Sequence, residues 1–76
     1  MKLLAVSGTR YRATIRLGWI EGVASNAMVA ERFTDVGLVD VQVFGDGRDR
    51  FADALWPGAS QEVDLPEQIT KVEVLT

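Results

Sequence analysis

Few residues in this sequence could carry out chemistry. Its 76 residues include no histidine and no cysteine, which excludes imidazole catalysis, thiolate chemistry, disulfides and nearly every structural zinc site. Without histidine, the serines lack a base that would activate them as nucleophiles. The remaining candidates are carboxylates, and Asp46, Asp49 and Asp53 follow one another around a glycine-rich segment. Such a group could serve as acid and base only if the fold gathered it in a cleft.

The segment Gly45-Asp46-Gly47-Arg48-Asp49 does not match a ligand-binding loop. It lacks the Asp-x-Asp-x-Asp-Gly spacing and final glutamate of a calcium loop, and also the Lys-Ser/Thr ending of a phosphate-binding loop. Two glycines around one aspartate favour a turn instead. We therefore expect no catalytic residue, no metal and no cofactor, and a protein that is not an enzyme.

Arginine recurs at alternate positions in residues 10 to 17. Arg10, Arg12 and Arg16 share one set of positions. The other set consists of Tyr11, Ala13, Ile15 and Leu17. This alternation predicts a strand with an apolar face toward the core and an arginine face toward solvent.

The arginine face raises the alternative of a nucleic-acid-binding module. Arginines on a strand could meet phosphates while Phe44 and Phe51 stack on bases. A net charge of -3 argues against this function, because polyanion binders usually carry a basic excess. We expect the arginines to pair instead with acidic residues of neighbouring strands. The candidates are Asp40, Asp53, Glu62 and Asp64.

A helix is predicted between Ser25 and Gly37. The Ser25 hydroxyl can cap free backbone amides, and Gly37 can adopt the left-handed conformation that ends a helix. Leu38 is then expected to fold back onto Phe33. The apolar stripe of this helix consists of Val29, Ala30, Phe33 and Val36.

The segments after the helix are short and bounded by turn residues, which indicates strands. Residues 50–56 fit a strand or, extended to 48–56, a second helix, and the glycine-rich turn before them favours the strand. Residues 2–6 form either a strand in a hairpin with residues 10–17 or a loose terminus. The other predicted strands span 38–44, 61–65 and 70–75, with a loop at 18–23 and turns at 45–47 and 66–68. The inward side chains of these strands are Val39, Val41, Val43, Ala52, Ala54, Trp56, Val72 and Val74.

These elements predict a single α+β domain over residues 1–76. It has one mostly antiparallel sheet of four or five strands, in the order β-α-β-β-β-β, with one helix packed on one face. Over residues 10 to 56 the order resembles the first half of a ferredoxin-like split β-α-β module, as in SPOR and heavy-metal-associated domains. The Met-x-Cys-x-x-Cys loop of the metal-binding family is absent, and no second helix follows Trp56. The resemblance therefore implies no function.

One helix cannot cover both faces of such a sheet. Phe44, Phe51 and Leu55 are expected on the open face, where aromatic and arginine side chains are typical of a partner interface. In the alternative with a second helix at 48–56, the same side chains pack into the core. The candidate partner-binding residues are Phe44, Phe51, Leu55, Arg12, Arg16, Trp19 and Ile20.

Trp19 and Ile20 lie in the loop between Gly18 and Gly22. We expect them to fold back and close the end of the core, because a small domain gains much from burying large apolar side chains. The alternative is that they contact a partner or a membrane interface.

The sequence thus predicts a non-enzymatic protein-interaction or assembly module. It would present an open sheet face or an edge strand to itself, as a homo-oligomer, or to a larger protein. Arginine outnumbers lysine, which suggests a bacterial or phage genome and a structural or accessory protein. The apolar run at residues 3–6 is too short for a signal peptide, so we expect a protein of the cytoplasm or of a virion, with no membrane span.

Overall fold

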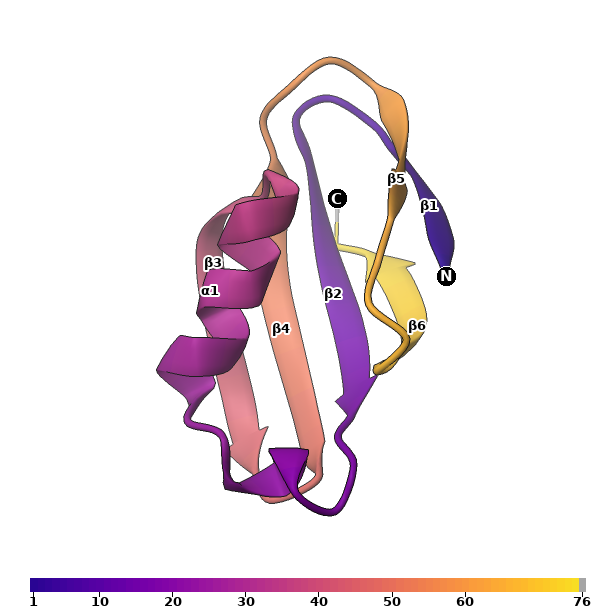
Figure 1. Cartoon of the computed structure of the whole chain (residues 1–76). Helices are drawn as coiled ribbons and strands as arrows, with labels where there is room; N and C mark the ends of the chain where they lie inside the picture. Colours follow the sequence, from indigo (N-terminus) through magenta and orange to yellow (C-terminus); the bar gives the residue numbers. More distant parts are fainter. Residues whose placement is uncertain (76) are drawn as a thin grey trace.

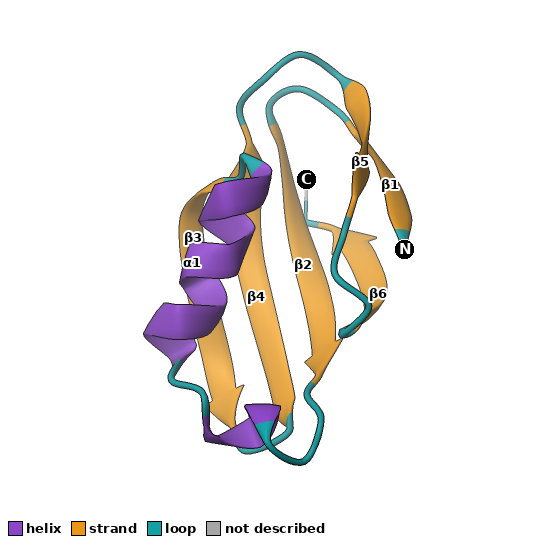
Figure 2. Cartoon of the chain, in the orientation of Figure 1, coloured by secondary structure: helices purple, strands orange, loops and turns teal. Residues whose placement is uncertain are grey.

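The computed structural model describes residues 1–75 and has one α-helix, one 3-10 helix and two antiparallel sheets (Figures 1 and 2). The elements in chain order are β1 (Lys2–Ala5), β2 (Thr9–Arg16), η1 (Glu21–Val23), α1 (Asn26–Val36), β3 (Val39–Asp46), β4 (Asp49–Trp56), β5 (Gln61–Asp64) and β6 (Ile69–Val74). The predicted α+β class is confirmed. Residues 50–56 lie within a strand, so the alternative of a second helix is wrong.

The larger sheet has four strands in the order β3-β4-β2-β6. β4 is antiparallel to both β2 and β3, so β2 and β3 are parallel to each other and α1 connects them. The insertion of β4 between them makes this a split β-α-β unit. Both edges of the sheet, β3 and β6, carry only one hydrogen-bonded neighbour each among the described residues.

β1 and β5 form a separate ribbon of two strands. β1 runs antiparallel to β5, from Lys2 opposite Asp64 to Ala5 opposite Gln61. Both alternatives for residues 2–6, a hairpin with β2 and a loose terminus, are therefore wrong. The placement of residues 61–65 in the main sheet is also wrong. Leu3 of β1 packs against the same core as Phe33 of α1. The ribbon and the helix thus share one face of the sheet.

The ends of α1 are capped as predicted. The Ser25 Oγ accepts a hydrogen bond from the backbone N–H of Met28 at 3.2 Å. Gly37 has φ 115°, and the N–H of Leu38 donates to the carbonyl of Phe33 at 3.2 Å. This six-to-one bond beside a left-handed glycine is a Schellman motif, and it places Leu38 in the same buried cluster as Phe33.

The core lies between the four-stranded sheet on one side and α1 with the β1–β5 ribbon on the other. The predicted inward face of β2, which is Tyr11, Ala13, Ile15 and Leu17, is buried, and so are Ala52, Ala54 and Trp56 of β4. Val29 and Phe33 of α1 are buried against them. The predicted apolar faces of β2, β4 and α1 are therefore confirmed.

A bulge in β3 places the side chain of Val39 on the face opposite to the predicted one. Between Val39 and Gln42 the register with β4 shifts by one residue, and Asp40 adopts φ 51°. One extra residue in a strand moves the side chains before it to the opposite face. Val39 is therefore opposite Leu55 on the open face rather than in the core. Val74, also expected inward, is exposed because it lies on edge strand β6 with a strand neighbour on one side only.

The β3–β4 turn is tighter than expected. The strands pair as far as Asp46 opposite Asp49, which leaves Gly47-Arg48 as a two-residue turn. Gly47 has φ 62°, and a glycine with positive φ at the first central position is typical of a type II′ hairpin turn. β3 therefore continues to Asp46, two residues beyond the predicted end of the strand at residue 44.

Candidate interaction surfaces

The segment between β2 and α1 carries the most exposed large apolar side chains among the described residues. Trp19, Ile20 and Val23 are 84%, 80% and 89% exposed, and Met28 at the start of α1 is exposed as well. The expectation that Trp19 and Ile20 close the core is therefore wrong. Leu17 is the last buried side chain before this segment, and none of the residues of η1, which begins directly after Ile20, is buried. We call Trp19, Ile20, Val23 and Met28 the end surface.

A buried arginine holds this segment in place. Arg50 lies on β4 opposite Ile15, on the covered side of the sheet, and is only 4% exposed. Its Nη2 donates to the carbonyls of Gly22 at 3.1 Å and Ala24 at 2.7 Å. Its Nη1 donates to the Asn26 side-chain oxygen at 2.8 Å, and its Nε donates to a carbonyl of the β3–β4 turn at 3.1 Å.

These bonds join three elements through one side chain. The planar guanidinium has five donors in a fixed geometry, and here four bonds reach η1, the start of α1 and the β3–β4 turn. Trp19, Ile20 and Val23 of the end surface therefore lie in a segment that hydrogen bonds from Arg50 hold in place. Sequence reasoning missed Arg50, although the signal was present: it precedes Ala52, Ala54 and Trp56 at a spacing of two, which places it on the buried side of the strand.

An apolar groove of about 530 Å³ opens beside the end surface. Its floor contains Ile15 of β2 and Leu17, which follows the end of this strand. One side is formed by α1 between Met28 and Phe33, and the other by the segment from Pro66 to Ile69. Ile20, Val23 and Met28 of the end surface also line it, so the exposed apolar side chains and the groove are continuous.

The polar groups of the groove are Glu21, Arg32 and Gln68. One carboxylate oxygen of Glu21 accepts from the N–H of Gly18 at 2.7 Å, and the other accepts from the Gln68 amide at 2.7 Å. Arg32, in contrast, has no ion pair and no side-chain hydrogen bond within residues 1–75. Among the described residues, Arg32 is therefore the charged side chain of the groove that lacks a partner, and its charge is positive.

The open sheet face is built from rows of side chains that cross the strands. Phe44 is opposite Phe51, and these two are 44% and 42% exposed. The next row places Gln42 opposite Asp53, and the row after it places Val39 opposite the half-buried Leu55. A polar row therefore separates the two apolar pairs.

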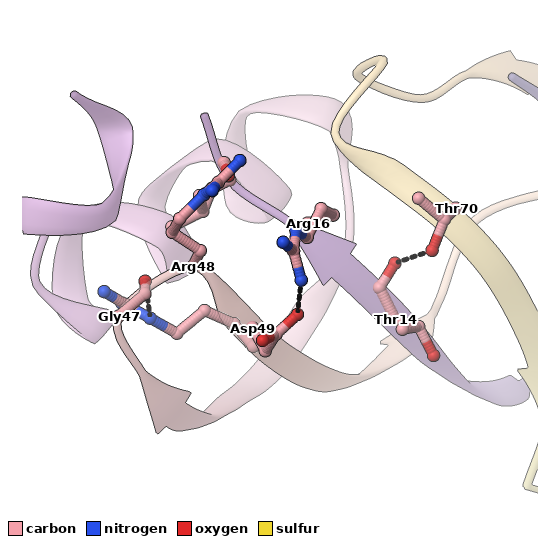
Figure 3. A network of polar contacts seen from close by, with 8 residues as sticks. Thr14, Arg16, Gly47, Arg48, Asp49 and Thr70 are labelled. Carbon is pink, nitrogen blue, oxygen red and sulfur yellow. Dashed lines mark hydrogen bonds and ion pairs between the residues drawn. The ribbon is translucent and has the colours of Figure 1, made fainter. Parts of the chain in front are cut away.

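The arginines of this face are paired with acidic side chains. Arg12 donates twice to Asp53, at 2.7 and 2.8 Å, and Arg10 is hydrogen-bonded to Asp40. These are two of the predicted partners. Arg16 donates to Asp49 at 2.7 Å (Figure 3), a partner that was not predicted.

The other two predicted partners do not contact these arginines. Glu62 instead lies 3.4 Å from Lys2 on the β1–β5 ribbon, and Asp64 has no ion pair among the described residues. Because every arginine of β2 is matched by an aspartate, the row offers little charge to phosphates. The nucleic-acid alternative loses its main support.

The Arg12–Asp53 pair also affects protonation. The hydrogen bond from Arg12, and its positive charge, lower the pKa of Asp53 below its ordinary value. The same contact raises the pKa of Arg12. The Asp53 side chain is only 15% exposed and that of Arg12 is 45% exposed, so the carboxylate has less access to water and depends more on the hydrogen bonds of the pair.

The carboxylates considered for chemistry are not gathered in a cleft. Asp49 and Asp53 pair with arginines on the open face, and the groove lining contains one carboxylate, Glu21. Within the described residues no three metal-ligating side chains cluster together, and no helix there is long and apolar enough to cross a bilayer. Comparison of the chain with family models, curated proteins and solved structures finds no match.

Proposed function

We propose that this protein is a non-enzymatic protein-interaction module that binds its partner through the end surface. The observation that carries the proposal is the exposure of Trp19, Ile20 and Val23, each at least 80% in solvent. Single domains rarely leave adjacent large apolar side chains in water without a use for them. Removal of each from water on binding is worth roughly 1.5–3 kcal/mol.

The composition and rigidity of the end surface both favour a protein partner. Tryptophan and methionine are enriched at the centres of protein interfaces. Arg50 binds the carbonyls of Gly22 and Ala24 beside these side chains, so a partner needs to order little of the backbone when it binds. The free energy gained by burying the apolar surface is then offset less by lost backbone entropy, and the affinity is higher.

The open sheet face supports the same class of function less strongly. Its apolar pairs, Phe44 with Phe51 and Val39 with Leu55, are separated by the row that contains the Arg12–Asp53 ion pair. A partner that covered this face would have to desolvate that ion pair, which is costly.

The edge strands are also poor sites for strand addition. The edge strand β3 contains the bulge at Asp40, and the edge strand β6 carries Lys71 and Glu73, whose side chains are 2.7 Å apart. Bulges and charges are common protections of sheet edges.

The proposal can be tested by placing a photo-reactive amino acid at position 19. We expect a single, saturable adduct with a protein, either a second copy or another chain, and light scattering on a sizing column distinguishes the two. Val23→Ser should abolish the adduct, because it removes a neighbouring apolar contact.

The matched control is the same probe at position 4. Leu4 is an exposed apolar residue on β1, outside the end surface. Equal adducts from positions 4 and 19, or an adduct that persists in the Val23→Ser variant, would show that the end surface is not the binding site.

A further inference from the structure

The groove beside the end surface lies over a part of the sheet that α1 and the β1–β5 ribbon leave uncovered. α1 packs on the side of β3, and the β1–β5 ribbon lies toward β6 on the same face (Figure 1). Between α1 and the segment that follows β5, the buried side chains of Ile15, Leu17 and Ile69 line the groove. An additional apolar element would complete this cover.

The size of the groove suits a few side chains of a helix. Its volume of about 530 Å³ lies within the roughly 300–1,000 Å³ of typical binding pockets. α1, which forms one side, has 11 residues and is therefore about 16 Å long. A helix laid along it would present side chains at positions i, i+3 or i+4, and i+7.

The lining favours a helix over an extended peptide. The backbone groups of β2 beneath the groove are already paired with β4 and β6, and α1 contributes side chains. An extended peptide would find no ladder of free N–H and C=O groups here, so its own backbone would lose hydrogen bonds to water. A helix satisfies its backbone internally and loses nothing in this way.

The charge of the groove indicates what that helix carries. Both carboxylate oxygens of Glu21 are occupied by Gly18 and Gln68, whereas Arg32 has no acidic partner in the described part of the chain. An acidic side chain on the ligand would supply the missing partner for Arg32, with the bidentate geometry that arginine favours.

We propose that the groove receives an amphipathic helix of the partner protein, with an Asp or Glu of that helix paired to Arg32. This inference depends on the proposed function, because the helix is the part of the partner that the end surface and groove would contact. The apolar face of the helix would cover Ile20, Val23 and Met28, and its acidic residue would set its register along α1.

A displayed library of random peptides, about 16 residues long, provides the probe. We expect panning against the full chain to enrich sequences with apolar residues at i, i+3 or i+4, and i+7, and with one acidic residue beside them. A synthetic peptide of the enriched sequence, followed by fluorescence anisotropy, gives the Kd. Arg32→Glu should weaken binding at least about tenfold, and replacing the acidic residue of the peptide with lysine should restore it.

Arg16→Glu is the matched control, since Arg16 lies on the open sheet face and should leave the Kd unchanged. If peptides bind and need Val23 but not Arg32, the inference about the acidic helix is wrong while the proposed function stands. If binding survives Val23→Ser and position 19 forms no adduct, both are wrong. Selection of peptides without helical spacing, or binding of a fatty acid such as decanoate in place of any peptide, would also overturn the inference.

Discussion

The end surface and the open sheet face both expose large apolar side chains, but they differ in their charges. On the sheet face, Arg10, Arg12 and Arg16 are each matched by an aspartate. In the groove beside the end surface, both carboxylate oxygens of Glu21 accept hydrogen bonds, whereas Arg32 has no ion pair among residues 1–75. The arginines of the sheet face are therefore paired within one chain, whereas Arg32 of the groove is available to an acidic partner.

The two surfaces also differ in how continuous their apolar area is. The phenylalanines of the sheet face are separated from Val39 and Leu55 by a polar row, while Ile20, Val23 and Met28 continue directly into the groove. Exposure of an aromatic side chain is thus a weak indication of a binding site by itself. The arrangement of its neighbours decides whether a partner gains from covering it.

The largest expected effect tests whether the end surface is held by one side chain. Arg50→Ala removes four hydrogen bonds and leaves carbonyl groups without donors, so the free energy of unfolding should fall by about 3 kcal/mol. Urea denaturation measures this loss. Amide hydrogen exchange should increase most at residues 18–26, because three of the four acceptors, on Gly22, Ala24 and Asn26, lie in this segment.

Arg16→Ala is the control for this prediction. Arg16 is an exposed arginine with one bond to Asp49, so its removal should cost less than about 1 kcal/mol. Equal losses in the two variants would mean that Arg50 does not hold the end surface.

A smaller effect tests whether the phenylalanines of the sheet face stabilise the fold. Phe44 and Phe51 are directly opposite each other, and a cross-strand aromatic pair is worth about 0.5–1.5 kcal/mol beyond its burial. A double-mutant cycle with Phe44→Ala and Phe51→Ala should give a coupling energy in this range, while the photo-adduct at position 19 persists. Loss of the adduct in these variants would indicate that the binding site lies on the sheet face instead of the end surface.

A third test uses pH to probe the charge pairing of the sheet face. Because Arg12 lowers the pKa of Asp53, the unfolded chain binds this proton more tightly than the native state. The pair therefore stabilises the native state above about pH 4, the ordinary range of the carboxyl, and this contribution disappears as pH falls through the lowered native pKa. Asp53→Asn should lower stability near neutral pH and match wild type in strong acid, as measured by urea denaturation.

Gln42→Asn, which alters an uncharged and exposed side chain opposite Asp53, serves as the control and should retain the wild-type pH profile. A constant difference between Asp53→Asn and wild type at all pH values would show that the Arg12 pairing does not contribute.

The smallest expected effect on stability belongs to the end surface itself. Trp19→Ser and Val23→Ser alter side chains that are more than 80% exposed, so the unfolding free energy should change by less than about 0.5 kcal/mol. Trp19→Phe should also remove most of the tryptophan fluorescence that acrylamide quenches, since Trp56 is buried. A large loss of stability in the serine variants would mean that these residues belong to the core after all.

Local patterns predicted most of the fold. The alternation in residues 10–17, the capping residues Ser25 and Gly37, and the strand at 50–56 all correspond to the structure. Each depends on interactions within a few residues of the chain. The pairing of β1 with β5 was missed because it joins segments about 60 residues apart, and neither segment carries a signal of its partner.

The candidate site was less predictable for the same reason. Trp19 and Ile20 were identified as notable residues, but their expected burial was wrong. Whether they enter the core depends on how much of its end Leu17 already fills, which is a property of packing. The partner of Arg16 was missed because β4 starts at Asp49 rather than at Arg50, where the predicted strand began.

The amino-acid sequence was sufficient to predict the α+β class and the inward faces of β2, β4 and α1, and it contains no histidine or cysteine for chemistry. Contacts between distant segments were needed to place Val39 on the open face and to bury Arg50 against η1. They also place Arg32, which has no ion pair in the described part of the chain, beside a groove along α1. The division has a physical basis: backbone periodicity and capping act over a few residues, whereas burial and charge pairing are set by contacts between segments that are distant along the chain.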